Sequence, residues 1–248
     1  MKQKLTPAER LIVAADFKEV SGRSEVYTKV LHLADQLAGT GVVLKINSAL
    51  RAHGYDLIDE IHARGLRVFA DLKLNDIPVT LASDGEFLRE ANPYILTAMC
   101  STGTAALKAL KDQLPETEVL GVTILTSLSE KDTARIYGKN LPSAVEALTD
   151  QVIDADGYPC VNGFICSAKE VHGLRQYFGN RDLSFNTPGI RPEWALVEGD
   201  DQNSDRVMTP GKAIKAGADR IVIGRPITQA KSPADAVTRT IEEIASAA

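Results

Sequence analysis

The stretch Val68-Phe69-Ala70-Asp71-Leu72-Lys73-Leu74-Asn75-Asp76-Ile77-Pro78 begins as an apolar run typical of a buried strand, then presents three charges where such a strand should end. Side chains two residues apart on a strand share a face, so Asp71 and Lys73 are expected to point the same way. Pro78 has no backbone N–H to donate to a neighbouring strand, and it can be the first residue of a helix. By themselves, two such charges are more often a surface ion pair at a strand end than a functional site.

Strand-type runs and helical patterns alternate on both sides of this stretch. The expected strands cover residues 11–15, 42–44, the opening stretch, 94–97, 119–124, 163–166, 183–186 and 220–223. The expected helices cover residues 24–37, a segment with Leu57, Ile58 and Ile61 that stops at Gly65, and residues 80–91, 104–114, 144–155, 168–177, 210–216 and 233–245.

Strict alternation of strands and helices implies parallel strands. Eight such units in 248 residues predict a (β/α)8 TIM barrel that forms a single domain over residues 1–248. An open, doubly wound sheet is the structural alternative. It usually has a Gly-rich turn after its first strand, and Ala15-Asp16-Phe17 is not such a turn.

The composition is that of an ordinary globular protein, with 44% hydrophobic and 25% charged residues. The formal net charge of −5 argues against a nucleic-acid partner and against an acidic membrane surface. Cys100, Cys160 and Cys166 lack metal-ligand spacing and are interpreted as reduced thiols. No apolar run suits a signal peptide or a membrane span, so we expect a cytoplasmic protein.

Chemically useful side chains follow several of the expected strands. Active groups of such barrels lie at the carboxyl ends of the strands. The polar residues found at those ends are Asp16, Lys45, Asp71, Lys73, Thr126 and Arg225. Their shared location favours a catalytic role over a surface ion pair.

The last two strands are followed by residues suited to binding a phosphate. Gly224 lets a backbone N–H approach an anion, and Arg225 supplies a planar fork of donors. The loop after the seventh strand is long and polar and contains Arg191 and Gln202. It fits a lid that closes over a phosphorylated substrate, although Gly224 and this loop could also be an ordinary helix cap and surface loop.

Three segments together resemble the orotidine 5′-phosphate decarboxylase family. The opening stretch is similar to the family's D-x-K-x-x-D-I-P motif. The segments 187–191, 200–202 and 206–210 resemble its phosphate lid, and 223–227 resembles its final phosphate motif. The resemblance covers essentially the whole chain in the right order. It implies a homodimer, with active sites at the interface, that converts orotidine 5′-phosphate to UMP and CO2 without a metal or cofactor, in the de novo synthesis of UMP.

The resemblance also assigns catalytic roles. Lys73 would donate the proton to C6 of the pyrimidine, and Asp71 would lie against the substrate carboxylate. Lys45 and Asp76 would complete the charge network, with Asp76 reaching in from the other subunit. An ammonium held by carboxylates suits this reaction, because it stabilises negative charge at C6 and then acts as the acid.

Binding roles follow from the same resemblance. Asp16 and Lys45 would bind ribose hydroxyls, Thr80 would contact the ribose or phosphate region of the partner's site, and Thr126 or Ser127 would hydrogen-bond the base. The expected phosphate ligands are Arg191, Gln202, Gly224 and Arg225.

Two departures and two alternatives accompany this interpretation. Asn47 stands where the family pattern leads us to expect Gly, and Met99-Cys100 replaces a common His-Ala pair. A Mg²⁺-dependent sugar-phosphate enzyme of the same suprafamily is one alternative, but its glutamate is replaced by Lys45, whose ammonium would repel a divalent ion. A catalytically silent phosphate-binding barrel is the other.

Overall fold

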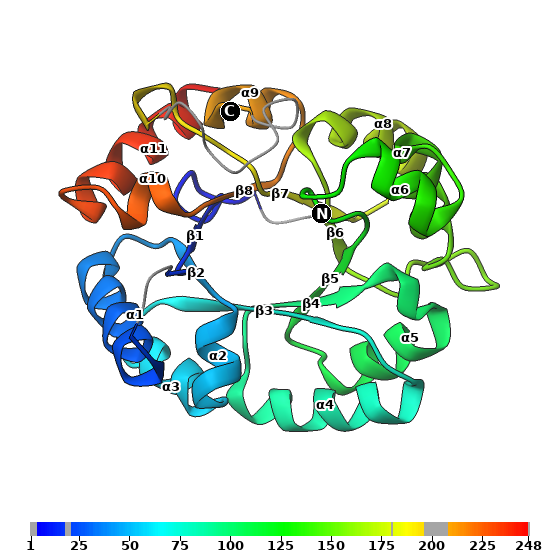
Figure 1. The fold of residues 1–248 in the computed structure, drawn as a ribbon, viewed down its shortest axis with the longest axis horizontal. Coiled ribbons are helices and arrows are strands. Elements are labelled where there is room, and N and C mark those ends of the chain that lie inside the picture. Colours follow the sequence, from blue (N-terminus) through cyan, green and yellow to red (C-terminus); the bar gives the residue numbers. More distant parts are fainter. Residues whose placement is uncertain (1–3, 18–20, 180, 196–207, 248) are drawn as a thin grey trace.

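The structure is a computed structural model that describes residues 4–17, 21–179, 181–195 and 208–247. Within these ranges, parallel strands β1 to β8 close into a barrel in chain order, and β8 pairs with β1 to complete the ring (Figure 1). The helices form an outer layer around that ring. The predicted (β/α)8 barrel is therefore confirmed.

The elements have the following bounds. The strands are β1 Leu11–Ala14, β2 Val43–Ile46, β3 Arg67–Leu74, β4 Ile95–Met99, β5 Glu118–Val122, β6 Gly163–Ile165, β7 Ser184–Thr187 and β8 Arg220–Ile223. The α-helices are α1 Arg23–Leu37, α2 Ser48–His53, α3 Asp56–His62, α4 Pro78–Ala91, α5 Thr104–Gln113, α6 Glu130–Tyr137, α7 Leu141–Asp150, α8 Ala168–Phe178, α9 Pro210–Lys215, α10 Arg225–Thr228 and α11 Pro233–Ala247. The short 3₁₀ turns are η1 Cys100–Thr102 and η2 Glu193–Ala195.

Two hydrophobic clusters follow from the alternation of side chains along each strand. In β1, Leu11 and Val13 belong to the large core, which also contains the buried faces of the helices. Ile12 and Ala14 belong to a smaller cluster inside the ring of strands. The buried members of this inner cluster are Ile12, Ala14, Val43, Phe69, Ile95, Leu120 and Val222. The barrel interior is thus a packed core, and any open site must lie above it.

A buried ion pair closes the end of the barrel where the strands begin. Glu118 is the first residue of β5 and Arg220 the first of β8. The Arg220 guanidinium donates to both Glu118 carboxylate oxygens, at 3.0 and 2.9 Å, and to the Tyr94 hydroxyl at 2.9 Å. Polar side chains at this end of such a barrel support stability rather than chemistry.

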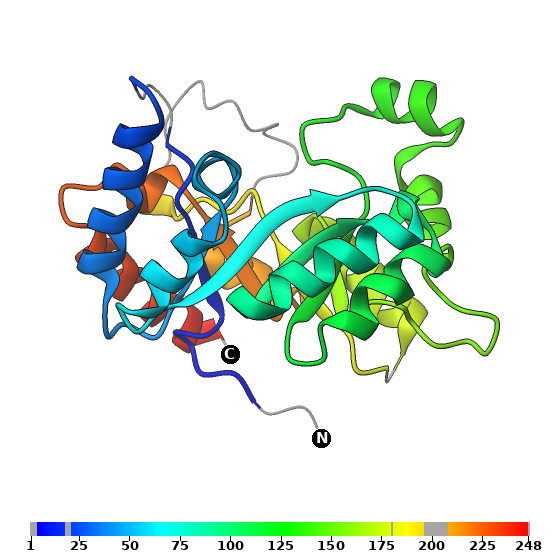
Figure 2. The same cartoon turned by 90° about the horizontal axis from the view of Figure 1, so that it is seen from below.

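Several helices differ from the prediction. α2, α6 and α10 were not expected, and α6 lies between the expected strand over 119–124 and the expected helix over 144–155. Figure 2 shows α6, in bright green, projecting away from the ring of strands. Its start is set by a capping box in which the Ser129 side chain accepts from the Asp132 N–H and the Asp132 carboxylate accepts from the Ser129 N–H.

The expected helix over 144–155 was wrong at its carboxyl end, because α7 stops at Asp150. The Asp154 carboxylate accepts the backbone N–H groups of Asp156 and Tyr158, at 3.1 and 2.7 Å, which folds this segment into a turn. No helix among the described residues is long and apolar enough to cross a lipid bilayer.

Candidate active site

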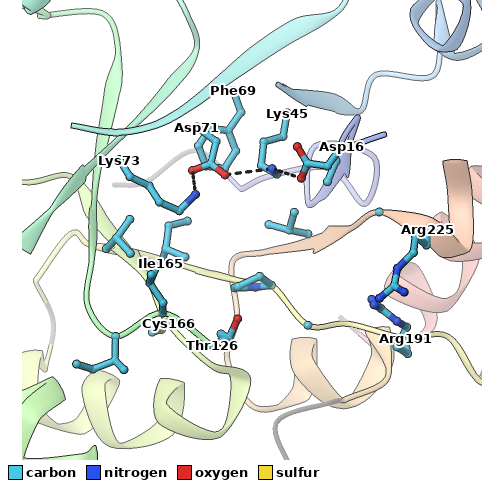
Figure 3. A pocket seen from close by; sticks show the side chains of 18 residues that line it. Asp16, Lys45, Phe69, Asp71, Lys73, Thr126, Ile165, Cys166, Arg191 and Arg225 are labelled. Carbon is cyan, nitrogen blue, oxygen red and sulfur yellow. Dashed lines mark hydrogen bonds and ion pairs between the residues drawn. The ribbon is translucent and has the colours of Figure 1, made fainter. Parts of the chain in front are cut away.

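A cavity of about 300 Å³ lies where the strands end. Ala14, Phe69 and Val222 of the inner cluster contribute its apolar floor. Eight of the residues nominated from the sequence line it, from the ends of six different strands (Figure 3): Asp16, Lys45, Asp71, Lys73, Thr126, Arg191, Gly224 and Arg225. A site built from the carboxyl ends of many strands is the usual arrangement of catalytic groups in such a barrel.

Charges of alternating sign run along one side of this cavity. The Lys45 ammonium donates to Asp16 Oδ2 at 2.6 Å and to Asp71 Oδ2 at 3.1 Å. The Lys73 ammonium donates to the other oxygen of Asp71, Oδ1, at 2.7 Å. Figure 3 shows the four side chains in one row, Asp16, Lys45, Asp71 and Lys73, joined by these contacts. Asp71 and Lys73 therefore meet, as the sequence indicated.

Burial makes the two central members of this row sensitive to the loss of a partner. Lys45 is 7% and Asp71 6% exposed. Burial by itself disfavours the charged form of Asp71, but Lys45 and Lys73 outweigh it and lower the pKa of the carboxyl to about 2. Burial likewise opposes the charge on Lys45, and Asp71 and Asp16 outweigh it, so the pKa of the ammonium is raised. Both residues are ionised at neutral pH.

The segment that supplies Asp71 and Lys73 is an irregular part of β3. Ala70 pairs with Leu96 and Leu74 with Ala98, so three residues of β3, 71 to 73, stand opposite one residue of β4. Lys73 has φ of 52°, in the left-handed region. For a residue other than glycine this conformation costs about 1 kcal/mol or more, and such strain persists only where neighbouring contacts hold it.

The single β4 residue opposite this bulge is Thr97, which sequence reasoning did not nominate. Its side chain is fully buried. The Thr97 hydroxyl donates to Asp71 Oδ1 at 2.9 Å and accepts the Lys73 N–H at 3.0 Å. Because these contacts depend on the irregular register between two strands, no pattern in the sequence of either strand indicated them.

A second group of cations lies across the cavity from Lys45 and Asp71. Figure 3 shows the guanidinium groups of Arg191 and Arg225 pointing toward one another. Arg191 follows β7 and is 7% exposed; its backbone N–H donates to the carbonyl of Met208 at 3.0 Å. Arg225 is the first residue of α10, directly after β8. Two guanidinium groups at one end of a polar cavity form a strong site for a phosphate.

Three of the nominated residues that the structure describes do not join the cavity in this chain. Asp76 is exposed, and its carboxylate accepts the backbone N–H of Ile77 at 2.7 Å. Thr80 lies on α4, and Ser127 is exposed just after Thr126. Neither is among the residues that line the cavity. Gln202 lies outside the described residues.

The donor set of the cavity suits an organic anion better than a metal ion. Each carboxylate in the row, Asp16 and Asp71, contacts the ammonium of Lys45, which would repel a divalent cation placed between them. Within the described parts of the chain, no group of three or more His, Cys, Asp or Glu side chains could hold a metal ion.

Comparison with known proteins identifies a family. Residues 9–240 match the model of the family described as "Orotidine 5'-phosphate decarboxylase / HUMPS family". The protein named orotidine 5'-phosphate decarboxylase from Pseudomonas syringae pv. syringae is 34% identical over 241 residues, which cover 95% of this chain and 97% of that protein. The protein of that name from a Methylobacterium species is 34% identical over 252 residues and is matched over 100% of both chains.

Solved structures agree with the sequence comparison. The crystal structure of orotidine 5'-phosphate decarboxylase from Lactobacillus acidophilus is 28% identical and superposes with a TM-score of 0.74. The match covers 95% of this chain and 99% of that one. Sequence and fold thus lead to the same group of enzymes.

Proposed function

The chain belongs to the orotidine 5′-phosphate decarboxylase / HUMPS family, and on that premise we propose that it is a carboxy-lyase that converts orotidine 5′-phosphate to UMP and CO2. The observation that carries the proposal is the row Asp16, Lys45, Asp71 and Lys73, in which successive charged groups are 2.6, 3.1 and 2.7 Å apart. We assign the enzyme to the de novo synthesis of UMP.

The row suits the chemistry of this decarboxylation. Loss of CO2 from C6 leaves an electron pair in the plane of the pyrimidine ring, where the ring delocalises it poorly. In our proposal the Lys73 ammonium, fixed by Asp71, stabilises that charge and then protonates C6. Asp71 lies against the departing carboxylate, so that their repulsion is relieved when CO2 leaves. These steps call on no organic cofactor.

The rest of the cavity would position the nucleotide. We assign the phosphate to Arg191, Gly224 and Arg225. The guanidinium groups of Arg191 and Arg225 lie across the cavity from the charged row. This separation places the reacting ring at one end and the binding energy of the phosphate at the other. Asp16 and Lys45 would hold the ribose hydroxyls between them. Thr126 is the better candidate for the base contact, because it lines the cavity whereas Ser127 does not.

A spectrophotometric assay tests the proposal. We expect the purified protein to convert orotidine 5′-phosphate to UMP at the same rate with and without EDTA. Lys73→Ala should abolish turnover but still fold, with a cooperative unfolding transition, and bind UMP. Lys215→Ala, which removes an exposed lysine on α9, is the matched control and should be fully active. Decarboxylation by Lys73→Ala at the wild-type rate would contradict the proposed function.

The same assay separates the two alternatives. Activity on a sugar phosphate that requires Mg²⁺ and is lost in EDTA would favour the metal-dependent branch of the family over our proposal. Binding of UMP with no change in the absorbance of orotidine 5′-phosphate would favour a silent phosphate-binding barrel. Lys45, which contacts both carboxylates in the row, is the residue that argues most directly against the metal-dependent alternative.

We further propose that two copies pair and share their active sites. The start and length of α4 carry three large apolar side chains that face solvent: Ile77 is 63%, Val79 73% and Phe87 62% exposed. Large apolar side chains exposed along one helix suit burial against a second copy of the chain. Asp76, which is exposed in the single chain, and Thr80 would then reach the partner's cavity.

Sedimentation of two variants tests the dimer. Phe87→Glu should shift the protein from dimer to monomer and lower activity, because Asp76 could no longer reach a second site. Tyr158→Glu changes a side chain that is 70% exposed elsewhere on the surface and should leave the dimer intact. A monomeric wild-type protein with full activity would contradict the shared site.

A further inference from the structure

We propose that Thr97 is a positioning residue for the reaction: its buried hydroxyl holds Asp71 and Lys73 in the relative placement that protonation at C6 requires. This inference rests on the proposed function and adds to it a residue on a strand that carries none of the nominated charges. The Thr97 hydroxyl contacts the Asp71 carboxylate at 2.9 Å and the Lys73 backbone N–H at 3.0 Å.

The position of Thr97 in the sheet explains why it can reach both partners. Residues 71 to 73 of β3 stand opposite Thr97 alone in β4, because the pairing passes from Ala70 with Leu96 to Leu74 with Ala98. The hydroxyl therefore faces both ends of the bulge, the side chain of Asp71 at one end and the backbone of Lys73 at the other.

The chemistry of a hydroxyl suits this double contact. It has one proton to donate and lone pairs to accept with, whereas the Lys73 N–H can only donate. Accepting the N–H leaves the hydroxyl proton for Asp71 Oδ1, the same oxygen that receives the Lys73 ammonium at 2.7 Å. Thr97 thus fixes the orientation of the carboxylate that in turn fixes the ammonium.

The backbone at Lys73 needs such support. Lys73 and Asn92 are the only residues other than glycine in the described ranges with a positive φ, at 52° and 47°. Asn92 follows the end of α4, where a left-handed residue is common. Lys73 lies within a strand instead. Its left-handed backbone directs the ammonium differently from that of a lysine in a regular strand.

A second contact holds the other side of the bulge. The Arg51 guanidinium of α2 donates to the carbonyl oxygen of Leu72 at 2.7 Å and to the side chain of Asn47. Leu72 and Lys73 are therefore held by β4 on one side and by α2 on the other. Of these two supports only Thr97 is buried and contacts a charged group of the row, so it is the one that we expect to affect catalysis.

Three substitutions at Thr97 test the role. Thr97→Val keeps the shape but removes the hydroxyl. Thr97→Ala removes the hydroxyl too. It is included because valine places a methyl group against the Asp71 carboxylate, and that contact could prevent folding. Thr97→Ser keeps the hydroxyl. Thr240→Val is the matched control, because Thr240 is equally buried but donates only to the carbonyl of Ala236 within α11.

The kinetic outcome is a split between kcat and KM. We expect Thr97→Val and Thr97→Ala to lower kcat by at least about tenfold, the effect of losing one hydrogen bond to a charged group, with KM nearly unchanged. Thr97→Ser should recover most of kcat, and Thr240→Val should match the wild type. Wild-type kcat in folded Thr97→Val and Thr97→Ala would overturn the proposal, as would a serine variant no better than the valine variant.

Crystal structures of the same variants keep this test independent of the proposed function. We expect the contact between Lys73 Nζ and Asp71 Oδ1 to open beyond about 3.5 Å in the hydroxyl-free variants and to persist in Thr97→Ser. If the wild type fails to decarboxylate orotidine 5′-phosphate, the proposed function fails, and this distance still decides whether Thr97 positions the pair. An unchanged ion pair in Thr97→Val would refute the positioning role.

Discussion

The replacement of Lys45 by methionine tests the charged row most directly. Methionine has a similar length and an apolar side chain, so Lys45→Met preserves packing at a site that is 7% exposed while it removes the ammonium. Asp16 is half exposed and can turn to solvent. Asp71 cannot, because it is buried, and it is left with Lys73 and Thr97 as partners.

The expected cost follows from this geometry. Removing one partner of a buried ion pair typically costs about 3–5 kcal/mol, because the other charge stays buried without compensation. Asp71 keeps one ammonium and one hydroxyl donor, so we expect the lower end, about 3 kcal/mol at neutral pH. In a chain of 248 residues this corresponds to a fall in melting temperature of roughly 6–12 °C.

The pH dependence gives the prediction its sign. In the wild type the pKa of Asp71 is lowered from 3.8 to about 2, so this group stabilises the fold above pH 4 or so and loses that effect as pH falls toward 2. In Lys45→Met one of the two ammonium groups that oppose burial is gone, so the pKa of Asp71 should lie higher than in the wild type. Acidification below about pH 4 then costs the wild type more stability than the variant, because the wild type has the larger lowering of this pKa to lose.

Urea unfolding of both proteins at several pH values, at one protein concentration, measures the difference. The gap in unfolding free energy between wild type and Lys45→Met should be widest at neutral pH and should narrow on acidification. Titrating groups away from the charged row are common to both proteins and cancel in the difference. The reasoning is refuted if Lys45→Met is as stable as the wild type at pH 7, or if the gap is the same at every pH.

Three further predictions concern the barrel and the phosphate end. Gly163→Ala should destabilise the protein by at least about 2 kcal/mol in urea unfolding, because a Cβ there would overlap the Ser184 carbonyl oxygen. Gly173→Ala on α8 is the control and should be neutral or stabilising, because its Cβ would meet nothing within 4 Å. Equal effects of the two substitutions would contradict this prediction. Glu118→Gln leaves the Arg220 guanidinium buried without its counterion and should lower the free energy of unfolding by about 3 kcal/mol. We expect kcat and KM to be unchanged, because the pair lies at the opposite end of the barrel from the cavity. Altered kinetics without a loss of stability would contradict that placement. Arg225→Ala should lower kcat/KM for orotidine 5′-phosphate by at least about tenfold and leave kcat/KM for unphosphorylated orotidine unchanged. An equal loss on both substrates would rule out a contact between Arg225 and the phosphate.

Local pattern in the sequence was sufficient for the architecture and for most of the candidate site. Strand runs and helical periodicity record which face of each element is buried, and their strict alternation allows few arrangements other than a closed parallel barrel. The polar residues that end each run then had to meet at one rim. The sequence therefore places Asp16, Lys45, Asp71 and Lys73 together, and these residues line one cavity.

Local pattern failed where a different local interaction or a long-range contact competed with it. The helix expected to reach residue 155 ends at Asp150, and the chain beyond it folds into a turn in which the Asp154 carboxylate accepts the N–H groups of Asp156 and Tyr158. α2 and α10 were missed because they are short and follow the strand ends Ile46 and Ile223 almost directly. Such short turns of helix leave little periodicity to read.

The sequence by itself determined the barrel and the row of charges at its rim, because the barrel depends on the regular alternation of apolar runs and the charges stand where those runs end. Only the tertiary structure decided how those charges are held. The bulge that opposes three residues of β3 to one of β4 and the Thr97 hydroxyl that contacts both of its ends depend on the register between strands. So does the pairing of Glu118 with Arg220, which are 102 residues apart. Register is set by the packing of the whole barrel, and no single segment encodes it.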